Sequence, residues 1–206
     1  MAKINPNRME LLKLRRRAKM AERGHKLLKD KLDELLRRFL ALIGQAGDSR
    51  ATVELALAEA FGTLALARGE GGTTVITEAL AGAGSPTEVR VGLDHLLNIE
   101  VPTFTVPEVR ISINYSLATT PAVLDSAVLG FEAAIGRLVK LAELEKTIQL
   151  LALEIDKTRR RVNALEYILI PQLNSDIKQI NMSLAEQERA NTTRVMKIKE
   201  MIESRK

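Results

Sequence analysis

The sequence predicts a mainly α protein, in which two long helices, one from each end of the chain, form an antiparallel coiled coil. A small α+β head with a β-hairpin lies between them in the sequence. Three observations predict this class: apolar residues alternate at spacings of three and four near the N-terminus, a second such stripe runs toward the C-terminus, and the stretch between them is rich in glycine. We expect residues 1–67 to form the first helix, 68–120 the head and 121–206 the second helix.

The first helix is predicted from a stripe that stays in phase for more than thirty residues, so that it keeps facing one partner helix. Asn5-Pro6-Asn7 supplies a cap and a proline that fixes the helical φ at the start. Gly44 and Gly47 loosen the pattern, and a continued, kinked or frayed helix fits there equally well. The predicted seam residues are Leu11, Leu14, Ala18, Ala21, His25, Leu28, Leu32, Leu35, Phe39 and Leu42.

The head is predicted from two glycine-rich breakers, residues 69–72 and 82–86, followed by two β-compatible runs. Thr87–Leu93 and Leu97–Phe104 each alternate apolar with polar residues, and the gap between them is short. A β-hairpin over about residues 87–104 is the simplest interpretation.

Turn and boundary residues refine this prediction of the head. We expect Asp94 and Asn98 in the hairpin turn. Proline lacks an N–H, so Pro102 and Pro107 confine the second half of the hairpin to a sheet edge. Thr119-Thr120-Pro121 should start the next helix, with the proline at its first helical position.

The second helix is predicted to run from residue 121 to near the C-terminus. Its stripe shifts phase between residues 165 and 177, which indicates a stutter, and Pro171 removes one backbone hydrogen bond there. We expect a kink or a locally straightened coil at this place, and we expect Leu11–Ala18 to lie near Leu184–Ile198. The predicted seam residues are Leu144, Ile148, Leu151, Ile155, Val162, Leu165, Leu169, Leu173, Ile177, Ile180 and Leu184.

Charge is distributed unevenly along the chain. Residues 1–50 contain 14 Lys or Arg against 6 Asp or Glu, residues 51–130 contain 3 against 9, and residues 131–206 contain 14 against 11. Pairing of the terminal helices would therefore make one end of the molecule basic and the other acidic, so the two ends should meet different partners.

Several function classes are disfavoured by composition. The chain has no cysteine, which excludes disulfides, thiolate metal sites and cysteine nucleophiles. It has no long apolar run and no secretory signal, so we expect a soluble protein with no direct membrane insertion. The glycines at 69–72 lack the Lys-Ser/Thr of a phosphate loop, so we expect no catalytic residues and no cofactor. The two histidines, His25 and His95, are far apart in the sequence, so we expect no metal.

The densest basic runs are Arg15-Arg16-Arg17 and Arg159-Arg160-Arg161. Solvation of an outer helix face explains such runs, and no aromatic interleaving or recognition-helix pattern accompanies them, so we expect no nucleic-acid partner. Ala18, Ala21 and Gly24 are small residues on one face, which lets two helices approach closely.

Two stretches of sequence resemble a known family. Residues 5–12, with Asn-Pro-Asn-Arg-Met-Glu-Leu-Leu, and residues 23–31, with Arg-Gly-His-Lys-Leu-Leu-Lys-Asp-Lys, closely resemble the N-terminal helix of the D subunit of V/A-type (vacuolar/archaeal-type) rotary ATPases. Residues 157–167 and Ile170-Pro171-Gln172-Leu173 resemble the C-terminal helix of the same family. The resemblance covers about 110 of the 206 residues, and it extends to more than the apolar stripe that unrelated coiled coils share.

The resemblance implies the role of a central-stalk axle, which is not itself catalytic. Such an axle inserts into a ring of alternating A and B subunits, which hold the ATP sites, and joins the F subunit of the central stalk and the socket subunit (C/d type) on the membrane rotor ring. It couples ATP hydrolysis or synthesis to rotation of the ion-translocating ring, in a cytoplasmic complex peripheral to the membrane. Pumping or synthesis, and proton or sodium transport, are decided by other chains.

A basic tip is expected to meet the inside of the catalytic ring through polar, individually weak contacts. A second interpretation of the same helices is a non-catalytic scaffold or tether that homodimerises. The residues assigned to the ring contact are Arg8, Lys13, Arg15, Arg16, Arg17, Arg194, Lys197 and Lys199.

Overall fold

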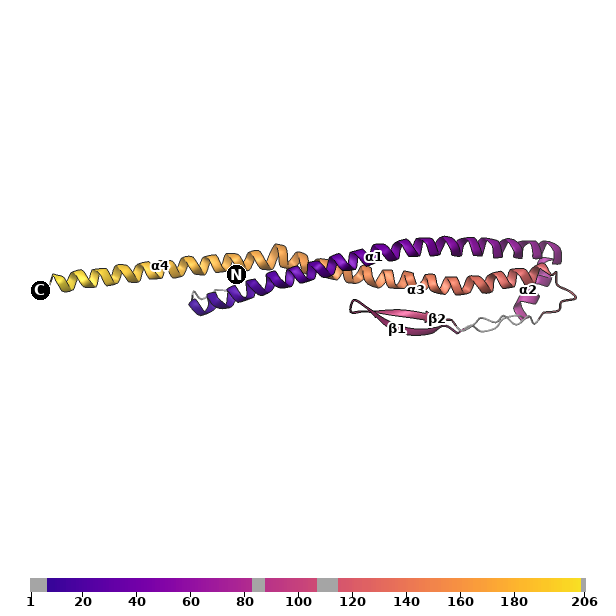
Figure 1. Cartoon of the computed structure of the whole chain (residues 1–206), viewed down its shortest axis with the longest axis horizontal. Coiled ribbons are helices and arrows are strands. Elements are labelled where there is room, and N and C mark those ends of the chain that lie inside the picture. Colours follow the sequence, from indigo (N-terminus) through magenta and orange to yellow (C-terminus); the bar gives the residue numbers. More distant parts are fainter. Residues whose placement is uncertain (1–6, 83–87, 107–114, 205–206) are drawn as a thin grey trace. The chain divides into compact units, whose positions relative to one another are not determined.

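A computed structural model describes residues 7–82, 88–106 and 115–204, and it confirms a mainly α chain with one two-stranded antiparallel hairpin in these ranges (Figure 1). The expected contributions of Asn5, Pro6, residues 83–87 and Pro107 lie outside the described residues. The elements are α1 (Arg8–Gly71), α2 (Thr73–Gly82), β1 (Arg90–Leu96), β2 (Ile99–Thr105), α3 (Val123–Ala164), the π-helix η1 (Leu165–Leu169) and α4 (Ile170–Glu203).

The chain divides into two compact units. One, which we call the terminal unit, combines Met1–Glu34 with Asp156–Lys206, and the other, the hairpin unit, is Leu35–Ile155. Helices α1 and α3 each contribute residues to both units.

The terminal unit is an antiparallel pair of helices. Along α1, Arg8 contacts Glu188, Arg15 contacts Asn181 and His25 contacts Glu166. The residue numbers of these partners fall as the residue numbers of α1 rise, so the two helices run in opposite directions. The buried cluster between them contains Leu14, Ala18, Leu173 and Ile180, flanked by Leu11, Ala21, Ile177 and Leu184.

The expected register of this pair is wrong. Leu11–Ala18 packs against residues 173–184, so the expected range Leu184–Ile198 is correct only at Leu184. An apolar stripe with a seven-residue repeat can slide by a heptad and still face its partner, so the stripe alone does not fix the register. Polar contacts such as Arg15 to Asn181 distinguish the alternatives. Residues 191–203 of α4 are exposed as a result.

A π-helix lies where the sequence predicted the stutter. In η1 the N–H of Ile170 donates to the carbonyl of Leu165, five residues back, and Pro171 follows directly in α4. The wider turn gives the proline ring room that a regular α-helix would deny it. Leu169, the last residue of η1, is 41% exposed, more than expected for a seam residue, because the extra residue in the turn rotates it outward.

In the hairpin unit α1 and α3 also run antiparallel. The ring of Phe61 meets that of Phe131 edge to face, with centroids 5.0 Å apart. A Cβ at Gly130 would lie 3.2 Å from the Cβ of Ala60, so this glycine allows close approach of the two helices.

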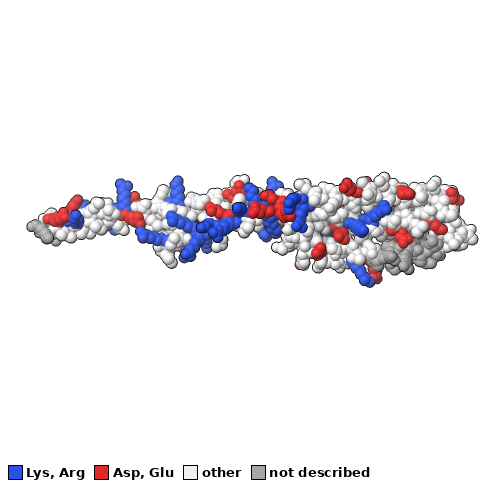
Figure 2. All heavy atoms as spheres, in the orientation of Figure 1, with Lys and Arg blue, Asp and Glu red and all other residues white. Residues whose placement is uncertain are grey.

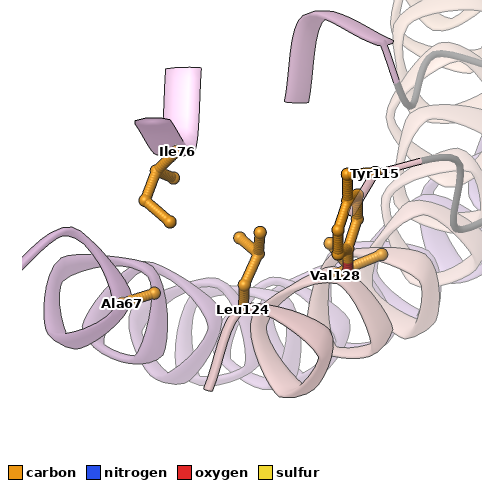
Figure 3. Close-up of a cluster of buried hydrophobic side chains, with 5 residues drawn as sticks. All are labelled: Ala67, Ile76, Tyr115, Leu124 and Val128. Atoms are coloured by element: carbon orange, nitrogen blue, oxygen red, sulfur yellow. The ribbon is translucent and has the colours of Figure 1, made fainter. Parts of the chain in front are cut away.

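The end of α1 closes against the start of α3. A Cβ at Gly71 would lie 2.9 Å from the Cδ of Pro121, and the next residue, Gly72, ends the helix with φ +80. Five buried residues form the core here, with side chains from three helices and from Tyr115 converging (Figure 3): Ala67, Ile76, Tyr115, Leu124 and Val128.

Helix boundaries refine the sequence prediction. Helix α1 continues as an α-helix through Gly44 and Gly47 and four residues beyond Ala67. Helix α2 was not predicted, because its first residues are β-branched and glycines flank it; burial of Ile76 stabilises it instead. Helix α3 begins at Val123 rather than at Pro121, whose carbonyl accepts the N–H of Leu124 in a tighter turn at 3.0 Å.

The hairpin was predicted correctly, and so was Asn98 in its turn, but Asp94 was not. Leu97 and Asn98 form a two-residue turn with φ of 50 and 66, as a type I′ turn requires, whereas Asp94 pairs with Val101 within the ladder. The backbone N–H of Phe104 donates to Oε2 of Glu143 on α3 at 2.8 Å, and the hairpin lies along α3 (Figure 1).

Candidate partner-binding surfaces

The residues assigned to a ring contact all lie in the terminal unit, and all are exposed. Figure 2 shows Lys and Arg side chains gathered over the part of the chain formed by the first half of α1 and by α4. The set comprises Arg8, Lys13, Arg15, Arg16, Arg17, Arg194, Lys197 and Lys199.

Some of these basic groups have intramolecular partners. The Lys13 ammonium lies 3.4 Å from Glu10, and that of Lys199 lies 3.7 Å from Glu203. Both lysines and Glu203 are largely exposed and Glu10 is 37% exposed, so each pair contributes only about 0–1 kcal/mol. These basic groups can therefore exchange their intramolecular contacts for contacts with an acidic partner at little cost.

The predicted seam residues lie at the interior faces of the helices. Leu14, Ala18, Leu35, Leu151, Val162, Leu173 and Ile180 are buried, and the others are half-buried, except Leu169. Thr158, on the same face as Val162, is also buried at 1% exposure.

His25 is a half-buried seam residue with a polar partner. Its Nε2 lies 3.3 Å from Oε2 of Glu166, which is itself in the π-helix. No group of three His, Cys, Asp or Glu among the described residues could hold a metal ion. The contact between His25 and Glu166 joins α1 to η1 within the terminal unit.

A groove opens beside the π-helix, and sequence analysis did not identify it. Its volume is about 420 Å³, and most of its wall is apolar. Met20, at its rim, is 72% exposed. The sequence predicted close helix packing at the small residues Ala21 and Gly24. In the structure they leave open space instead, since a Cβ at Gly24 would meet no described atom within 4 Å. The lining residues are Arg17, Met20, Ala21, Gly24, Leu165, Leu169 and Leu173.

Apolar side chains are also exposed at two other places. On α4, beyond the part paired with α1, Val195, Ile198 and Ile202 follow one another on one helix face and line a shallow groove. On β1, Val91 and Leu93 point to the same face of the hairpin and are 65% and 71% exposed. Contiguous exposed apolar residues mark surfaces that partners cover.

Titration distinguishes one further residue in the hairpin unit. Burial, the hydrogen bond to Asp125 and the negative charge of that carboxylate raise the pKa of Tyr115 to about 12. The phenol donates to Oδ1 of Asp125 at 2.5 Å, in the first turn of α3. This pair ties the chain before α3 to the helix, so we assign it a structural role.

No helix in the described part of the chain is long and apolar enough to cross a membrane.

Comparison with known proteins extends the resemblance over nearly the whole chain. Residues 10–200 match the family model described as the D subunit of ATP synthase. The chain is 44% identical over 204 residues to the V-type ATP synthase D subunit of Thermoanaerobacter sp. (strain X514), with 98% of each chain covered. It is 40% identical over 206 residues to the A-type ATP synthase D subunit of Pyrococcus furiosus, covering 98% of this chain and 96% of the relative.

Proposed function

Because the chain belongs to the family of ATP synthase D subunits, we propose that it is the central rotor shaft of a V/A-type ATPase. In this role it couples ATP hydrolysis or synthesis in the catalytic A/B ring to rotation of the membrane ion-translocating ring. The shaft itself makes and breaks no covalent bond.

The observation that carries this proposal is the length of α1 and its pairing. Helix α1 has 64 residues, which corresponds to roughly 96 Å at the standard rise, and it continues without interruption through Gly44 and Gly47. A helix of that length in water needs a packed partner. Antiparallel packing in each unit supplies one, and two helices packed together resist twisting better than one.

The basic surface of the terminal unit supports insertion into the catalytic ring. A bearing surface should make many weak polar contacts, because a large apolar contact would hold the shaft at one angle. The exposed arginines and lysines there, including Arg15, Arg16 and Arg17, fit guidance of the shaft by acidic groups of the A and B subunits.

The remaining partners are assigned to the hairpin unit. Its sequence is poor in Lys and Arg, and the exposed apolar side chains of Val91 and Leu93 offer a surface that another protein can cover. We assign this unit to the F subunit and to the socket subunit (C/d type) of the membrane rotor ring. The chain would then be a cytoplasmic component, held at the membrane only through the complex.

A single-molecule experiment tests the shaft role. The A and B ring is assembled with this chain and the F subunit, and the ring is fixed to a surface. The chain has no cysteine, so a Glu78→Cys variant carries a single bead at an exposed position of α2. We expect the bead to turn in one direction when ATP is added and to stop when ATP is removed.

The result that contradicts the proposal is a bead that stays fixed while the same assembly hydrolyses ATP. Unlabelled assemblies provide the reference ATPase rate, and an assembly without ATP gives the background motion. Turnover of ATP by the purified chain alone, abolished by a substitution within it, would contradict the non-catalytic role.

A further inference from the structure

We propose that the groove beside the π-helix receives one bulky apolar side chain from an acidic segment of a catalytic-ring protein. This inference rests on the proposed shaft function and adds a defined contact to the polar guidance described above. The groove lies within the terminal unit, between α1 and the η1–α4 segment.

The groove is shaped for an apolar side chain. Leu165 and Leu169 form one wall, and Met20 and Gly24 form the other. Met20 and Leu169 are 72% and 41% exposed, so both would lose contact with water if an apolar group entered between them. A Cβ built on Gly24 has no described neighbour within 4 Å, so the space in front of this glycine is open.

The π-helix explains why the groove exists at this position. In a regular coiled coil Leu169 would turn toward α1 and fill the gap opposite the small residues Ala21 and Gly24. The extra residue in the turn rotates Leu169 partly outward, so that it becomes the wall of a groove. Single π-turns within α-helices are frequent at functional sites.

The charge around the groove identifies the occupant. Arg17 lines the groove directly. Between Lys13 and Arg23, α1 carries six Lys or Arg and only one acidic residue, Glu22. A segment with Asp or Glu next to its apolar side chain would bind here, whereas a second copy of this basic chain would be repelled.

The contact would give the shaft preferred angles. The groove opens on one side of the helix pair, so a turning shaft presents it to the surrounding ring proteins one after another. Burial of one side chain is enough to hold the shaft briefly at each such angle and small enough to be released in the next step.

Two matched pairs of variants test the groove. Met20→Gln changes an exposed groove residue, and Leu27→Gln changes a residue with similar exposure, 70%, that does not line the groove. Gly24→Leu fills the groove, and Gly62→Leu adds the same side chain at another α1 glycine with open space. Glutamine and leucine are good helix formers, so all four variants should keep the helix.

The measurements are the dissociation constant of each variant from the A and B ring and the dwell times of the rotating bead. We expect Met20→Gln and Gly24→Leu to raise the dissociation constant about tenfold or more and to shorten the dwells. Leu27→Gln and Gly62→Leu should stay within about twofold of the unsubstituted chain. Thermal unfolding followed by circular dichroism confirms that each variant is folded.

Equal effects within each pair would overturn the groove proposal, as would no effect of any variant on a chain that binds the ring and rotates. If the unsubstituted chain neither binds the ring nor rotates, the shaft function fails instead. A photo-crosslinker attached to a Gly24→Cys variant supplies an independent readout. We expect it to capture a ring protein beside acidic residues, and capture of a second copy of this chain would also overturn the proposal.

Discussion

The carboxylate of Glu143 accepts a hydrogen bond from the backbone N–H of Phe104 at 2.8 Å, so a side chain of α3 satisfies a backbone donor of β2. Phe104 pairs with Val91 across the hairpin, and its side chain is half-buried. This bond ties the hairpin to the helix pair of the hairpin unit.

Replacing Glu143 by alanine should loosen the hairpin without unfolding the helices. A hydrogen bond to a charged group contributes about 1.5–3 kcal/mol, and its loss leaves the N–H of Phe104 without its acceptor. We expect faster amide exchange at Phe104 and an unchanged helical circular dichroism signal. Glu143→Gln, which keeps an acceptor oxygen, is the control. Equal exchange rates in both variants would show that the bond does not hold the hairpin.

The Tyr115 phenol should make stability depend on alkaline pH. Its pKa is raised from 10.0 to about 12, so the folded chain binds the phenol proton more tightly than the unfolded chain does. The stabilisation is complete below pH 10 and is lost as the pH rises through about 12. A spectroscopic titration in a Tyr167→Phe background, where Tyr115 is the only tyrosine, checks this prediction. A Tyr115 titration near pH 10 would contradict it.

Leu35 should be the more sensitive of two nearby leucines on α1. Leu35 is fully buried, whereas Leu40 is 67% exposed. Leu35→Ala should lower the free energy of unfolding by about 2–5 kcal/mol, because it removes buried methyl groups and leaves a cavity. Leu40→Ala should change it by less than about 0.5 kcal/mol. Denaturant unfolding measures both, and similar losses would contradict the burial of Leu35.

The turn residue Leu97 should be replaceable with a gain in stability. A leucine at φ of 50 costs about 1–2 kcal/mol, because its Cβ crowds the backbone in the left-handed region, which asparagine tolerates better. Leu97→Asn should stabilise the hairpin by about 0.5–1 kcal/mol and slow amide exchange in β1 and β2. Leu97→Ala keeps the Cβ and should bring no such gain; a gain from alanine would point to another cause.

The arginines at 15–17 should act together rather than singly. Each of these arginines is exposed, and a single exposed charge contributes little to binding. The dissociation constant from the ring should therefore stay within about threefold of that of the unsubstituted chain when only one of Arg15, Arg16 or Arg17 is replaced by alanine. The triple variant should bind the ring distinctly more weakly, and the difference from the unsubstituted chain should shrink at high salt, where charges are screened. Loss of rotation from one substitution alone would identify a specific trigger instead of a guide.

The sequence predicted the features of the fold that depend on residues close together in the chain, and it missed those that depend on contacts between distant residues. Periodic apolar stripes located both long helices, because burial on one helix face is recorded locally in the spacing. The register between them was wrong, since a heptad stripe fits at several offsets and the choice depends on distant pairs such as Arg15 with Asn181. Helix α2 was missed because it is stabilised by tertiary packing, in which Ile76 is fully buried and Ala79 and Leu80 pack beside it.

The candidate surfaces show the same division. The basic residues were predictable as an exposed group, because charge runs are visible in the sequence. The groove was not, since it depends on the outward rotation of Leu169 and on empty space in front of Gly24. The phase shift before Pro171 predicted an irregularity at that place, but the stripe alone did not distinguish a kink from a π-turn.

The π-turn also sets a rule for building chimaeras between members of this family. One extra residue in a helix rotates everything that follows by about 100°. Consider a chimaera in which a relative supplies the sequence up to Ile170 and this chain supplies the rest of α4. Leu173 and Ile180 keep facing α1 only if the relative has the same number of residues across the segment that corresponds to Leu165–Leu169. If the relative has one residue fewer in that segment, the inner face of α4 turns toward solvent, although the apolar spacing within α4 is intact.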